Sequence, residues 1–232
     1  MTTPRARRRQ ELDREILRLG RAQLADVGAA SLSVRAIARE LGLASSAVYR
    51  YVASRDELLT RLVVAAYDDL ADQVAAAVTA NPGPPAAELR TALQAFRAWA
   101  LAHSAEFSLL YGSPVPDYHA PPERTSAPGT RVIGQLLGLL GEAFTAHPTA
   151  PSRVNPSPPA RLQHELQSTA EEFGAALDDA GMVAAISLWC WLIGAVGQEV
   201  TGGFGPETFD DPAALFDMQL QHQLAVLNLQ QF

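Results

Sequence analysis

Lysine is absent from this chain of 232 residues, and there is only one cysteine. A single cysteine excludes an internal disulfide and is typical of a reducing compartment. Cys190 lies between two tryptophans in an apolar run, which predicts a core position rather than a reactive thiol. Because lysine is missing, the permanently charged basic side chains are all arginines, whose planar guanidinium suits phosphates and guanine edges. A GC-rich genome would favour the same composition.

Motifs of catalysis and metal binding are also missing. The five histidines show no H-x-x-x-H or H-E-x-x-H spacing, and the lone cysteine has no metal ligand near it in the sequence. Glycines occur inside apolar segments rather than after a strand, so they do not form a phosphate loop. No serine stands in a nucleophile elbow. We therefore expect a protein that is not an enzyme and that carries no metal or cofactor.

No segment alternates between apolar and polar residues, so the sequence predicts an all-α fold. The arginines near the N-terminus are not followed by the apolar stretch of a signal peptide. Residues 180–198 are uncharged and approach the length of a membrane span, but Asp179 and Glu199 flank them and no basic anchor is present. We interpret this run as a helix in the core or in a subunit interface. The expectation is a cytoplasmic protein with no membrane partner.

Charge is distributed unevenly along the chain. The net charge is −7, which taken alone argues against a nucleic-acid partner. Residues 1–61, however, hold 12 arginines against 7 acidic residues, a net charge of +5. Residues 62–232 hold 6 arginines against 18 acidic residues, a net charge of −12. This distribution concentrates the attraction for phosphate at the N-terminal end of the chain.

Residues 33–59 contain the most informative pattern, which is two short helices joined by a tight turn and followed by a third helix. Ile37 and Leu41 lie one turn apart on the first helix. Val48 and Val52 repeat this spacing on the second helix. Each helix therefore has one apolar stripe to bury, and a glycine between them supplies the permissive backbone of the turn.

The second helix leaves a set of hydrogen-bond donors exposed, and none of them is negatively charged. A short helix that presents donors and one cation is suited to the major groove of DNA. These features together predict a helix-turn-helix. The exposed residues are Ser45, Ser46, Tyr49, Arg50 and Tyr51.

This segment resembles the DNA-binding domain of TetR-family transcriptional regulators. The residues that carry the resemblance are Ser33, Ile37–Ala38, Gly42–Leu43, Tyr49 and Arg55–Leu59. Two positions depart from the family pattern. Ala44 stands where the family usually has the serine or threonine that caps the recognition helix, so Ser45 is expected to cap it instead. Val52 replaces the usual phenylalanine within the core.

The resemblance implies phosphate contacts for residues that flank the recognition helix and base contacts for those on its exposed face. The phosphate contacts would be Ser33, Arg35, Tyr51 and Arg55. The base-facing residues would be Ser45, Ser46, Tyr49 and Arg50. Arg50 suits a bidentate contact with guanine. The alternatives are a packing role for Tyr49, a solvated charge for Arg50 and, for the arginines of residues 5–9, either a phosphate contact or a mobile tail.

The expected organisation is a DNA-binding domain over residues 1–54 and an effector-binding and dimerisation domain over residues 55–232. A capping box that starts at Ser54 begins a long helix that crosses the charge boundary and runs to about Val78. The other helices are expected at residues 10–27, 86–103, 105–111, 130–146, 159–178, 180–201 and 212–229. Two segments, 112–129 and 148–159, contain too many prolines for regular structure.

The C-terminal half resembles the WHG-type effector domain of many actinobacterial TetR-type proteins. The matching residues are 189–194, Glu199, Gly203 and Phe204, together with 109–116. Ile193 stands where the name-giving histidine would be, so no function of that histidine is carried over. We expect a ligand pocket lined by Trp99, His103, Phe107, Tyr111, Tyr118, Phe144 and Trp189. For any single aromatic residue the alternative is an ordinary core position.

Apolar residues cover more than one face of the last two expected helices, which predicts that these helices pair with their copies across a two-fold axis. The residues expected at this interface are Leu188, Trp191, Leu192, Leu220 and Leu224. The resulting hypothesis is a homodimeric regulator of transcription whose partners are a double-stranded DNA operator and a small-molecule effector. We expect a repressor that an apolar or aromatic molecule releases from a pseudo-palindromic operator. The alternatives are an activator, or a DNA-binding protein without an effector.

Overall fold

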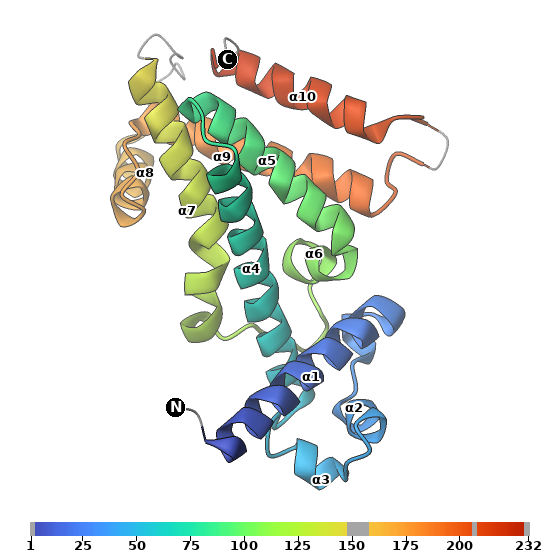
Figure 1. The fold of residues 1–232 in the computed structure, drawn as a ribbon. Helices are drawn as coiled ribbons and strands as arrows, with labels where there is room; N and C mark the ends of the chain where they lie inside the picture. The colour runs from blue at the N-terminus through green and yellow to red at the C-terminus, as the bar shows by residue number, and fades with distance from the viewer. Residues whose placement is uncertain (1–2, 148–157, 206–207, 230–232) are drawn as a thin grey trace. The chain divides into compact units, whose positions relative to one another are not determined.

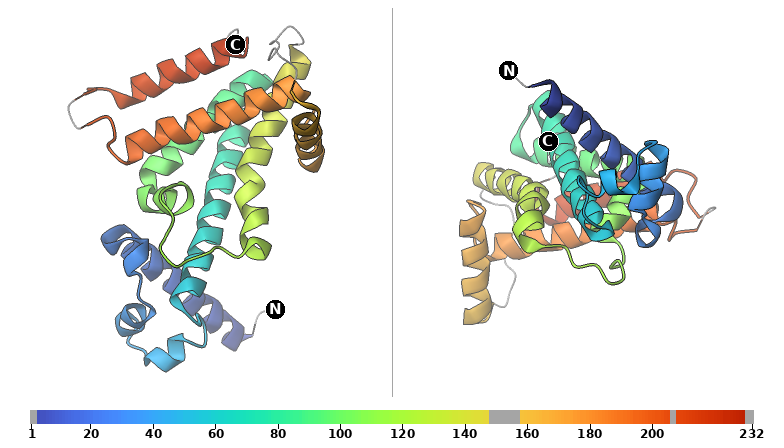
Figure 2. Two further views of the ribbon diagram at one scale, coloured as in Figure 1. Left: turned by 180° about the vertical axis from the view of Figure 1, so that it is seen from behind. Right: turned by 90° about the horizontal axis from the view of Figure 1, so that it is seen from below.

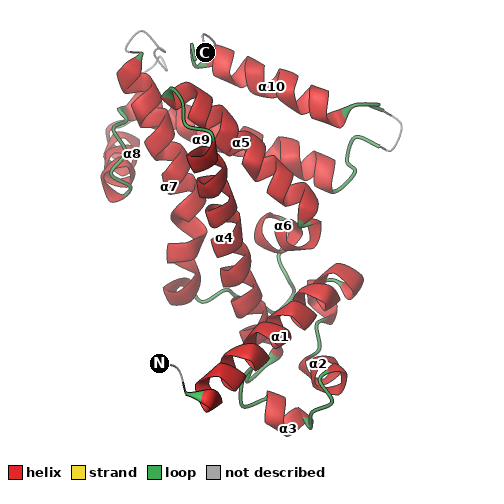
Figure 3. Ribbon diagram, viewed as in Figure 1, coloured by secondary structure: helices red, strands yellow, loops and turns green. Residues whose placement is uncertain are grey.

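The computed structural model describes residues 3–147, 158–205 and 208–229, and these residues form helices without any strand (Figure 3). The predicted all-α fold is therefore confirmed. The described α-helices are α1 (Pro4–Val27), α2 (Val34–Glu40), α3 (Ser45–Val48), α4 (Arg55–Ala80), α5 (Pro85–Ala102), α6 (Ser104–Tyr111), α7 (Pro122–Ala146), α8 (Ala160–Glu172), α9 (Asp179–Val200) and α10 (Pro212–Val226), with a short 3₁₀ turn η1 (Ala29–Ser31). Most of the expected proline-rich segment 148–159 lies outside the described residues.

The helices group into two units according to the contacts within the chain. Of the described residues, the head unit comprises those in 1–69 and 103–129, and the body unit comprises those in 70–102 and 130–232. The helices α4 and α7 contribute residues to both units (Figure 1). This division differs from the expected boundary at residue 54, because α6 and the start of α7 group with the helix-turn-helix.

The first helix, α1, begins at Pro4, earlier than residue 10 where the sequence predicts its start. Thr3 caps it, since the threonine hydroxyl accepts a hydrogen bond from the backbone N–H of Ala6 at 3.3 Å. Proline is tolerated in the first turn because its missing N–H would have no partner inside the helix. The arginine cluster therefore lies on the first turns of a helix and does not form an irregular tail.

An apolar core shared by α1, α2, α3 and α4 holds the head unit together. Ile37 of α2, Val48 of α3 and Leu59 of α4 are fully buried in it. The helices α1 and α4 approach closely at Gly20, where an added Cβ would lie 3.2 Å from a methyl carbon of Leu58. The predicted apolar stripes of the two short helices face this core and fix the position of α3.

The long helix α4 begins where the sequence predicts. The hydroxyl of Ser54 accepts a hydrogen bond from the backbone N–H of Glu57 at 3.0 Å, which is one half of the expected capping box. The helix ends at Ala80, before a proline-rich turn. Because α4 starts in the head unit and continues into the body unit, it is a continuous backbone link between them.

The helix α6 and the first turns of α7 complete the head unit. The helix α6 packs along α1, and Arg21 of α1 lies 3.9 Å from the carboxylate of the buried Glu106. The helix α7 begins at Pro122, inside the segment 112–129 that was expected to be irregular. A helix is possible there because Pro122 occupies its first position, where no N–H donor is needed, and only Pro128 lies in its interior.

The body unit is built around α9, which contacts α5, α8 and α10 (Figure 2). Phe96 of α5 and Leu192 of α9 are fully buried in it. A salt bridge joins the same two helices, because Nε of Arg97 donates to a carboxylate oxygen of Glu199 at 2.8 Å. The Arg97 guanidinium also lies 5.2 Å from the ring centroid of Phe216 on α10.

The helix α9 contains the uncharged run noted in the sequence. Among the described residues it is the one helix long and apolar enough to cross a membrane by length and composition alone, and 39% of its most apolar window is buried. Its contacts with three other helices agree with the expected core or interface position. The core position predicted for Cys190 is wrong, because this side chain is exposed. The described helices that contact α9 therefore leave part of its apolar surface, including Ile186 and Cys190, uncovered.

Candidate DNA-binding site

The recognition helix α3 is only four residues long, Ser45–Val48. Ala44 is its N-cap residue, and no side chain caps the helix. The expectation that Ser45 caps it is therefore wrong, because Ser45 is already the first helical residue and a capping side chain must precede it. The helix is positioned instead by the burial of Val48 and by the preceding turn, in which Gly42 adopts a φ of 65°.

The helix α3 and the two residues that follow it present polar side chains to solvent. Ser46 and Arg50 are exposed and Tyr49 is 38% exposed, whereas Ser45 is half-buried. These four residues offer hydroxyl and guanidinium donors and no carboxylate, which suits the acceptors on base edges and phosphates. The structure thus brings together the four residues predicted to face the bases.

Ser33 and Arg35 lie at the start of α2. Ser33 is the N-cap residue: its hydroxyl accepts a hydrogen bond from the backbone N–H of Ala36 at 3.2 Å. Its own N–H donates to the side-chain oxygen of Gln23 on α1 at 3.1 Å. Ser33 therefore stabilises the first turn of α2, a structural role that was not expected from the sequence. Arg35 is exposed on the first turn.

Arg55 has partners other than the predicted phosphate. Its Nη2 donates to the carbonyl oxygens of Ala29 at 3.1 Å and Ala30 at 3.2 Å, both in η1. Its Nη1 lies 3.4 Å from a carboxylate oxygen of Asp56. Because these acceptors engage the guanidinium, the structure gives Arg55 the role of tying the start of α4 to the turn after α1.

Tyr51, also predicted to contact a phosphate, is half-buried and joins α1 to α4. Its carbonyl oxygen accepts a hydrogen bond from Arg61 of α4. Arg61 in turn pairs with Glu57 at 2.7 Å and with Asp13 of α1 at 3.3 Å. The Arg9 guanidinium lies 5.8 Å from the centroid of the Tyr51 ring. These contacts fix the backbone directly after the recognition helix.

Arg124 of α7 is a second arginine that pairs with Glu57. Nη1 of Arg124 donates to one carboxylate oxygen of Glu57 at 2.5 Å, and Nη2 donates to the other at 3.3 Å. The hydrogen bond from Arg124, followed by that from Arg61, lowers the pKa of Glu57 below its usual range. The same carboxylate raises the pKa of Arg124. We call Arg124, Glu57, Arg61 and the Tyr51 carbonyl the ion-pair chain.

The ion-pair chain could be found only in part from the sequence. Glu57 and Arg61 show the i, i+4 spacing of a helical ion pair. Arg124 gives no such signal, because it lies 67 residues from Glu57 along the chain and inside a segment expected to be a loop.

The seven residues predicted to line a ligand pocket fall into both units. Those in the head unit are His103, Phe107, Tyr111 and Tyr118. The rings of Phe107 and Tyr111 are 5.3 Å apart, and burial raises the pKa of Tyr111. The Tyr111 ring also lies 6.2 Å from that of Tyr67 on α4. The hydroxyl of Tyr118 is 3.1 Å from that of Thr60, and His103 lies 4.0 Å from a carboxylate oxygen of Asp69.

The other three predicted pocket residues belong to the body unit. Trp99 is buried, Phe144 is half-buried, and the ring of Trp189 lies 5.8 Å from that of Phe96. Within each unit these aromatics pack against neighbouring rings or helices. Such packing agrees with the ordinary core position that the sequence left open for each of them.

Most of the residues predicted at a dimer interface are buried inside the single chain. The buried residues are Leu188, Leu192, Leu220 and Leu224. Trp191 is half-buried and stacks on Phe216 with ring centroids 5.5 Å apart. A side chain covered by its own chain has no surface to offer to a second copy. The large apolar side chains that α9 and α10 leave exposed are Ile186, Met218 and Val226.

Two protein-family models match this chain. Residues 16–62 match the family described as bacterial regulatory proteins, tetR family. Residues 89–223 match the tetracyclin repressor-like C-terminal domain. The first match contains the helix-turn-helix, and the second covers most of the remaining helices.

Curated relatives are similar over almost the whole chain. The HTH-type transcriptional regulators Rv1816 of Mycobacterium tuberculosis and Mb1846 of Mycobacterium bovis are each 43% identical over 221 residues. The aligned region covers 94% of this chain and 93% of each relative. Both relatives are named as helix-turn-helix regulators of transcription.

Solved structures share the fold. SCO4313, described as a regulatory protein, is similar with a TM-score of 0.76 at 30% identity, over 96% of this chain and 100% of that chain. A tetR-family regulatory protein from Rhodococcus RHA1 has a TM-score of 0.59 at 16% identity, over 93% of this chain and 96% of that chain, and supports the fold alone. The helix-turn-helix geometry, the family models and the relatives agree that this chain belongs to the TetR family of DNA-binding transcriptional regulators.

Proposed function

We propose that this regulator is a homodimeric repressor that binds a pseudo-palindromic operator and is released by an apolar or aromatic small molecule. The observation that carries the proposal is an exposed face of donors, formed by Ser46 on the one-turn helix α3 and by Tyr49 and Arg50 directly after it, and positioned by buried neighbours. The net charge of +5 on residues 1–61 supports it, because DNA attracts a basic surface.

In this proposal, different residues make the sequence-specific and the non-specific contacts with DNA. Arg50 reads a guanine edge, and a good bidentate contact discriminates between bases by about 1–3 kcal/mol. Arg35, exposed on the first turn of α2, binds a backbone phosphate without regard to sequence. A two-fold dimer presents two such heads, and half-sites one helical turn of DNA apart, or a multiple of it, follow from that symmetry.

The second copy of the chain would cover the exposed apolar residues of α9 and α10. Met218 is 63% exposed and Val226 is 60% exposed, while Ile186 is 45% exposed. Covering these side chains in a dimer would remove their apolar surface from water, which stabilises association. Met218→Arg should yield monomer in sedimentation velocity at micromolar concentration. Ala213→Arg, an exposed position at the start of α10, should leave the dimer intact, and dimer in both variants would contradict this placement.

The effector would act through helices of the head unit that follow the helix-turn-helix in sequence. The rings of Tyr67, Phe107 and Tyr111 lie together there, on α4 and α6. A ligand that displaces α6 or α7 would disturb the ion-pair chain, which ends on the backbone next to the recognition helix. Allosteric coupling of this kind is typically about 1–3 kcal/mol, and DNA must weaken ligand binding by the same factor.

The repressor proposal is tested first on DNA. Purified protein should enrich a small set of fragments from its own genome, each with two related half-sites. Arg50→Ala should relax the preference at one base position. Arg18→Ala is the matched control, because Arg18 is an exposed arginine of α1 that pairs with Glu15. Enrichment no better than that of bulk DNA would contradict the proposal.

The effector part is tested separately. A panel of apolar and aromatic molecules is screened for a rise in melting temperature, and each hit is titrated against the operator complex. A true effector releases DNA and binds the DNA-bound protein more weakly than the unbound protein by the same factor. Equal affinity for both forms would favour a regulator without this switch, and a hit that strengthens DNA binding would favour the opposite response.

A further inference from the structure

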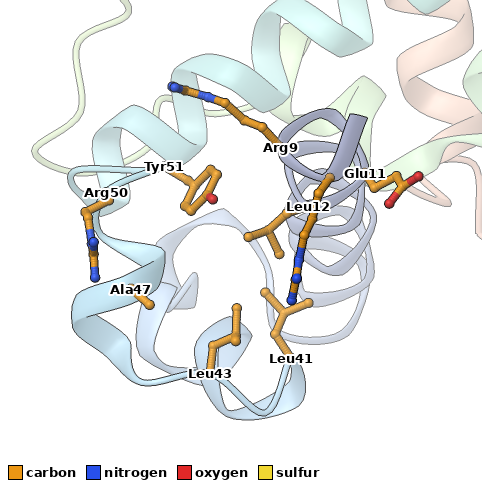
Figure 4. Close-up of a pocket in the computed structure, with 9 residues that line it drawn as sticks. Arg9, Glu11, Leu12, Leu41, Leu43, Ala47, Arg50 and Tyr51 are labelled. Atoms are coloured by element: carbon orange, nitrogen blue, oxygen red, sulfur yellow. The ribbon is translucent and has the colours of Figure 1, made fainter. Parts of the chain in front are cut away.

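A groove lies on the head unit beside the recognition helix (Figure 4). It has a volume of about 630 Å³ and is lined by residues of α1, of the turn between α2 and α3, and of the recognition segment. None of the seven residues predicted to line an effector pocket belongs to it. The groove is therefore a separate feature from the aromatic cluster of the head unit.

The lining of the groove combines an apolar floor with basic edges. Leu12, Leu43 and Tyr51 contribute to the floor, and Figure 4 shows the two leucines directed toward the space in front of the tyrosine ring. Arg8, Arg9 and Arg50 also line the groove, together with Glu11. Three arginines against one glutamate leave a charge of +2 around an apolar surface.

This combination selects a class of ligand. Concave sites of about 300–1,000 Å³ are typical of small-molecule binding, and this one is lined by four charged residues beside five residues that offer apolar surface. The floor matches a hydrocarbon body, which a DNA phosphate does not have. The arginines match a carboxylate, because a guanidinium can donate two parallel hydrogen bonds to it.

We propose that the groove binds an anionic amphiphile in the form of a free long-chain carboxylate. Its head group would pair with Arg8 and Arg9, and its chain would cover Leu12, Leu43 and Tyr51. Arg50 and Tyr51 belong both to the groove and to the set of predicted DNA contacts. The bound carboxylate therefore competes with DNA at the recognition segment itself. This second means of control is independent of an effector that acts through α6 or α7.

The test is calorimetric titration of the full-length protein with dodecanoate below its micelle-forming concentration. Butyrate carries the same head group without the long chain and should not bind detectably. Removing both basic partners in Arg8→Ala/Arg9→Ala should weaken dodecanoate binding roughly tenfold or more, because charge-assisted hydrogen bonds are lost. Leu43→Gln should weaken dodecanoate binding by a similar factor, because it places a polar side chain on the apolar floor of the groove. Arg14→Ala, an exposed arginine of the same helix outside the groove, should leave it unchanged.

The substituted side chains of Arg8, Arg9 and Leu43 are exposed, so all variants should remain folded, and the double arginine variant loses only the contact of Arg9 with the Tyr51 ring. Equal dodecanoate affinity in the wild type and both groove variants would overturn the proposal, since the ligand would then bind elsewhere. Binding to anionic vesicles without binding of dissolved dodecanoate would also overturn it, in favour of a lipid surface.

A second measurement uses a double-stranded DNA fragment as the probe. Dodecanoate should weaken DNA binding by the wild type but not by Leu43→Gln. If Arg8→Ala/Arg9→Ala weakens DNA binding while dodecanoate does not bind the wild type, the groove holds the DNA backbone and the proposal is wrong. The calorimetric result does not depend on repression, so failure of the repressor proposal is distinguishable from failure of this one.

Discussion

Different combinations of contacts stabilise the inside of the head unit and the inside of the body unit. In the head unit, short helices surround a small apolar core, and arginines pair with carboxylates on other helices, as Arg61 does with Asp13. The body unit is built from long helices around α9, whose most apolar window has a mean hydropathy of 1.8. Its part-buried ion pair joins Arg97 to Glu199, with side chains 17% and 14% exposed. Both units thus have an apolar core, and the head unit adds ion pairs between helices close to the recognition segment.

Because of this difference, core substitutions should have different effects in the two units. The DNA-facing residues are positioned by a few buried side chains close to them in sequence. A change in the head core should therefore affect both stability and DNA binding, whereas an equal change in the body core should affect stability alone.

The strongest test compares Ile37→Ala in the head unit with Leu192→Ala in the body unit. Both side chains are fully buried, so each substitution should lower the free energy of unfolding by about 2–5 kcal/mol through lost contacts and a cavity. Denaturant titration measures this loss. Ile37→Ala should also weaken DNA binding of the folded protein, because Ile37 packs in the core that positions the recognition helix. Equal DNA affinities in the two variants would contradict the claim that only the head core positions the recognition helix.

Arg97→Ala tests the part-buried ion pair of the body unit. The substitution leaves the largely covered Glu199 carboxylate without its arginine, which should cost about 1–3 kcal/mol of unfolding free energy. Arg97→Met combined with Glu199→Leu should recover most of this loss, because the apolar pair has no charge to desolvate. Thermal denaturation of the wild type, Arg97→Ala and the double variant measures these differences. A double variant no more stable than Arg97→Ala would contradict the expected recovery.

Arg55→Ala and Arg35→Ala separate a structural arginine from a DNA-binding one. Losing the hydrogen bonds to the Ala29 and Ala30 carbonyls should cost about 1–2 kcal/mol of stability while leaving the salt dependence of DNA binding unchanged. Arg35→Ala should instead leave stability unchanged and lower the salt slope by about one. DNA affinity measured over a series of salt concentrations tests both. A lower slope in Arg55→Ala would restore its predicted phosphate contact.

The smallest effect is a pH dependence at Glu57. Its pKa is lowered in the folded chain, so its contribution to stability is present above the pKa of the unfolded carboxyl and is lost as the pH falls through the folded pKa. Such partly exposed pairs contribute about 1 kcal/mol or less. Melting temperatures of the wild type and Glu57→Gln should therefore differ at neutral pH and converge in acid below about pH 4. A constant difference across this range would rule out ionisation of Glu57 as the cause.

The helix-turn-helix was predictable because its determinants are close in sequence. The spacing of Ile37 and Val48 reports buried stripes directly, and the cap at Ser54 is a local pattern. The sequence did not reveal contacts with distant partners, or a cap displaced by one residue. Arg55 bonds carbonyls that lie 25 and 26 residues earlier, and Ala44 rather than Ser45 precedes the recognition helix.

The body unit was harder to predict for a different reason. The helix α9 is apolar on several faces, so periodicity alone cannot tell which face the chain covers itself and which it leaves exposed. Leu188 and Leu192 were therefore assigned to an interface although the chain's own helices bury them. Distinguishing these faces requires the positions of α5, α8 and α10, which no local pattern contains.

The one-turn recognition helix without a side-chain cap has an evolutionary consequence. Its shape is set by Val48 and by the preceding turn, so the outward residues Ser46, Tyr49 and Arg50 contribute little to folding. Substitutions at these positions alter what is read on the DNA at nearly constant stability. A duplicated copy of the gene can therefore acquire a new target site through changes at these few codons, without first accumulating compensating mutations in the core.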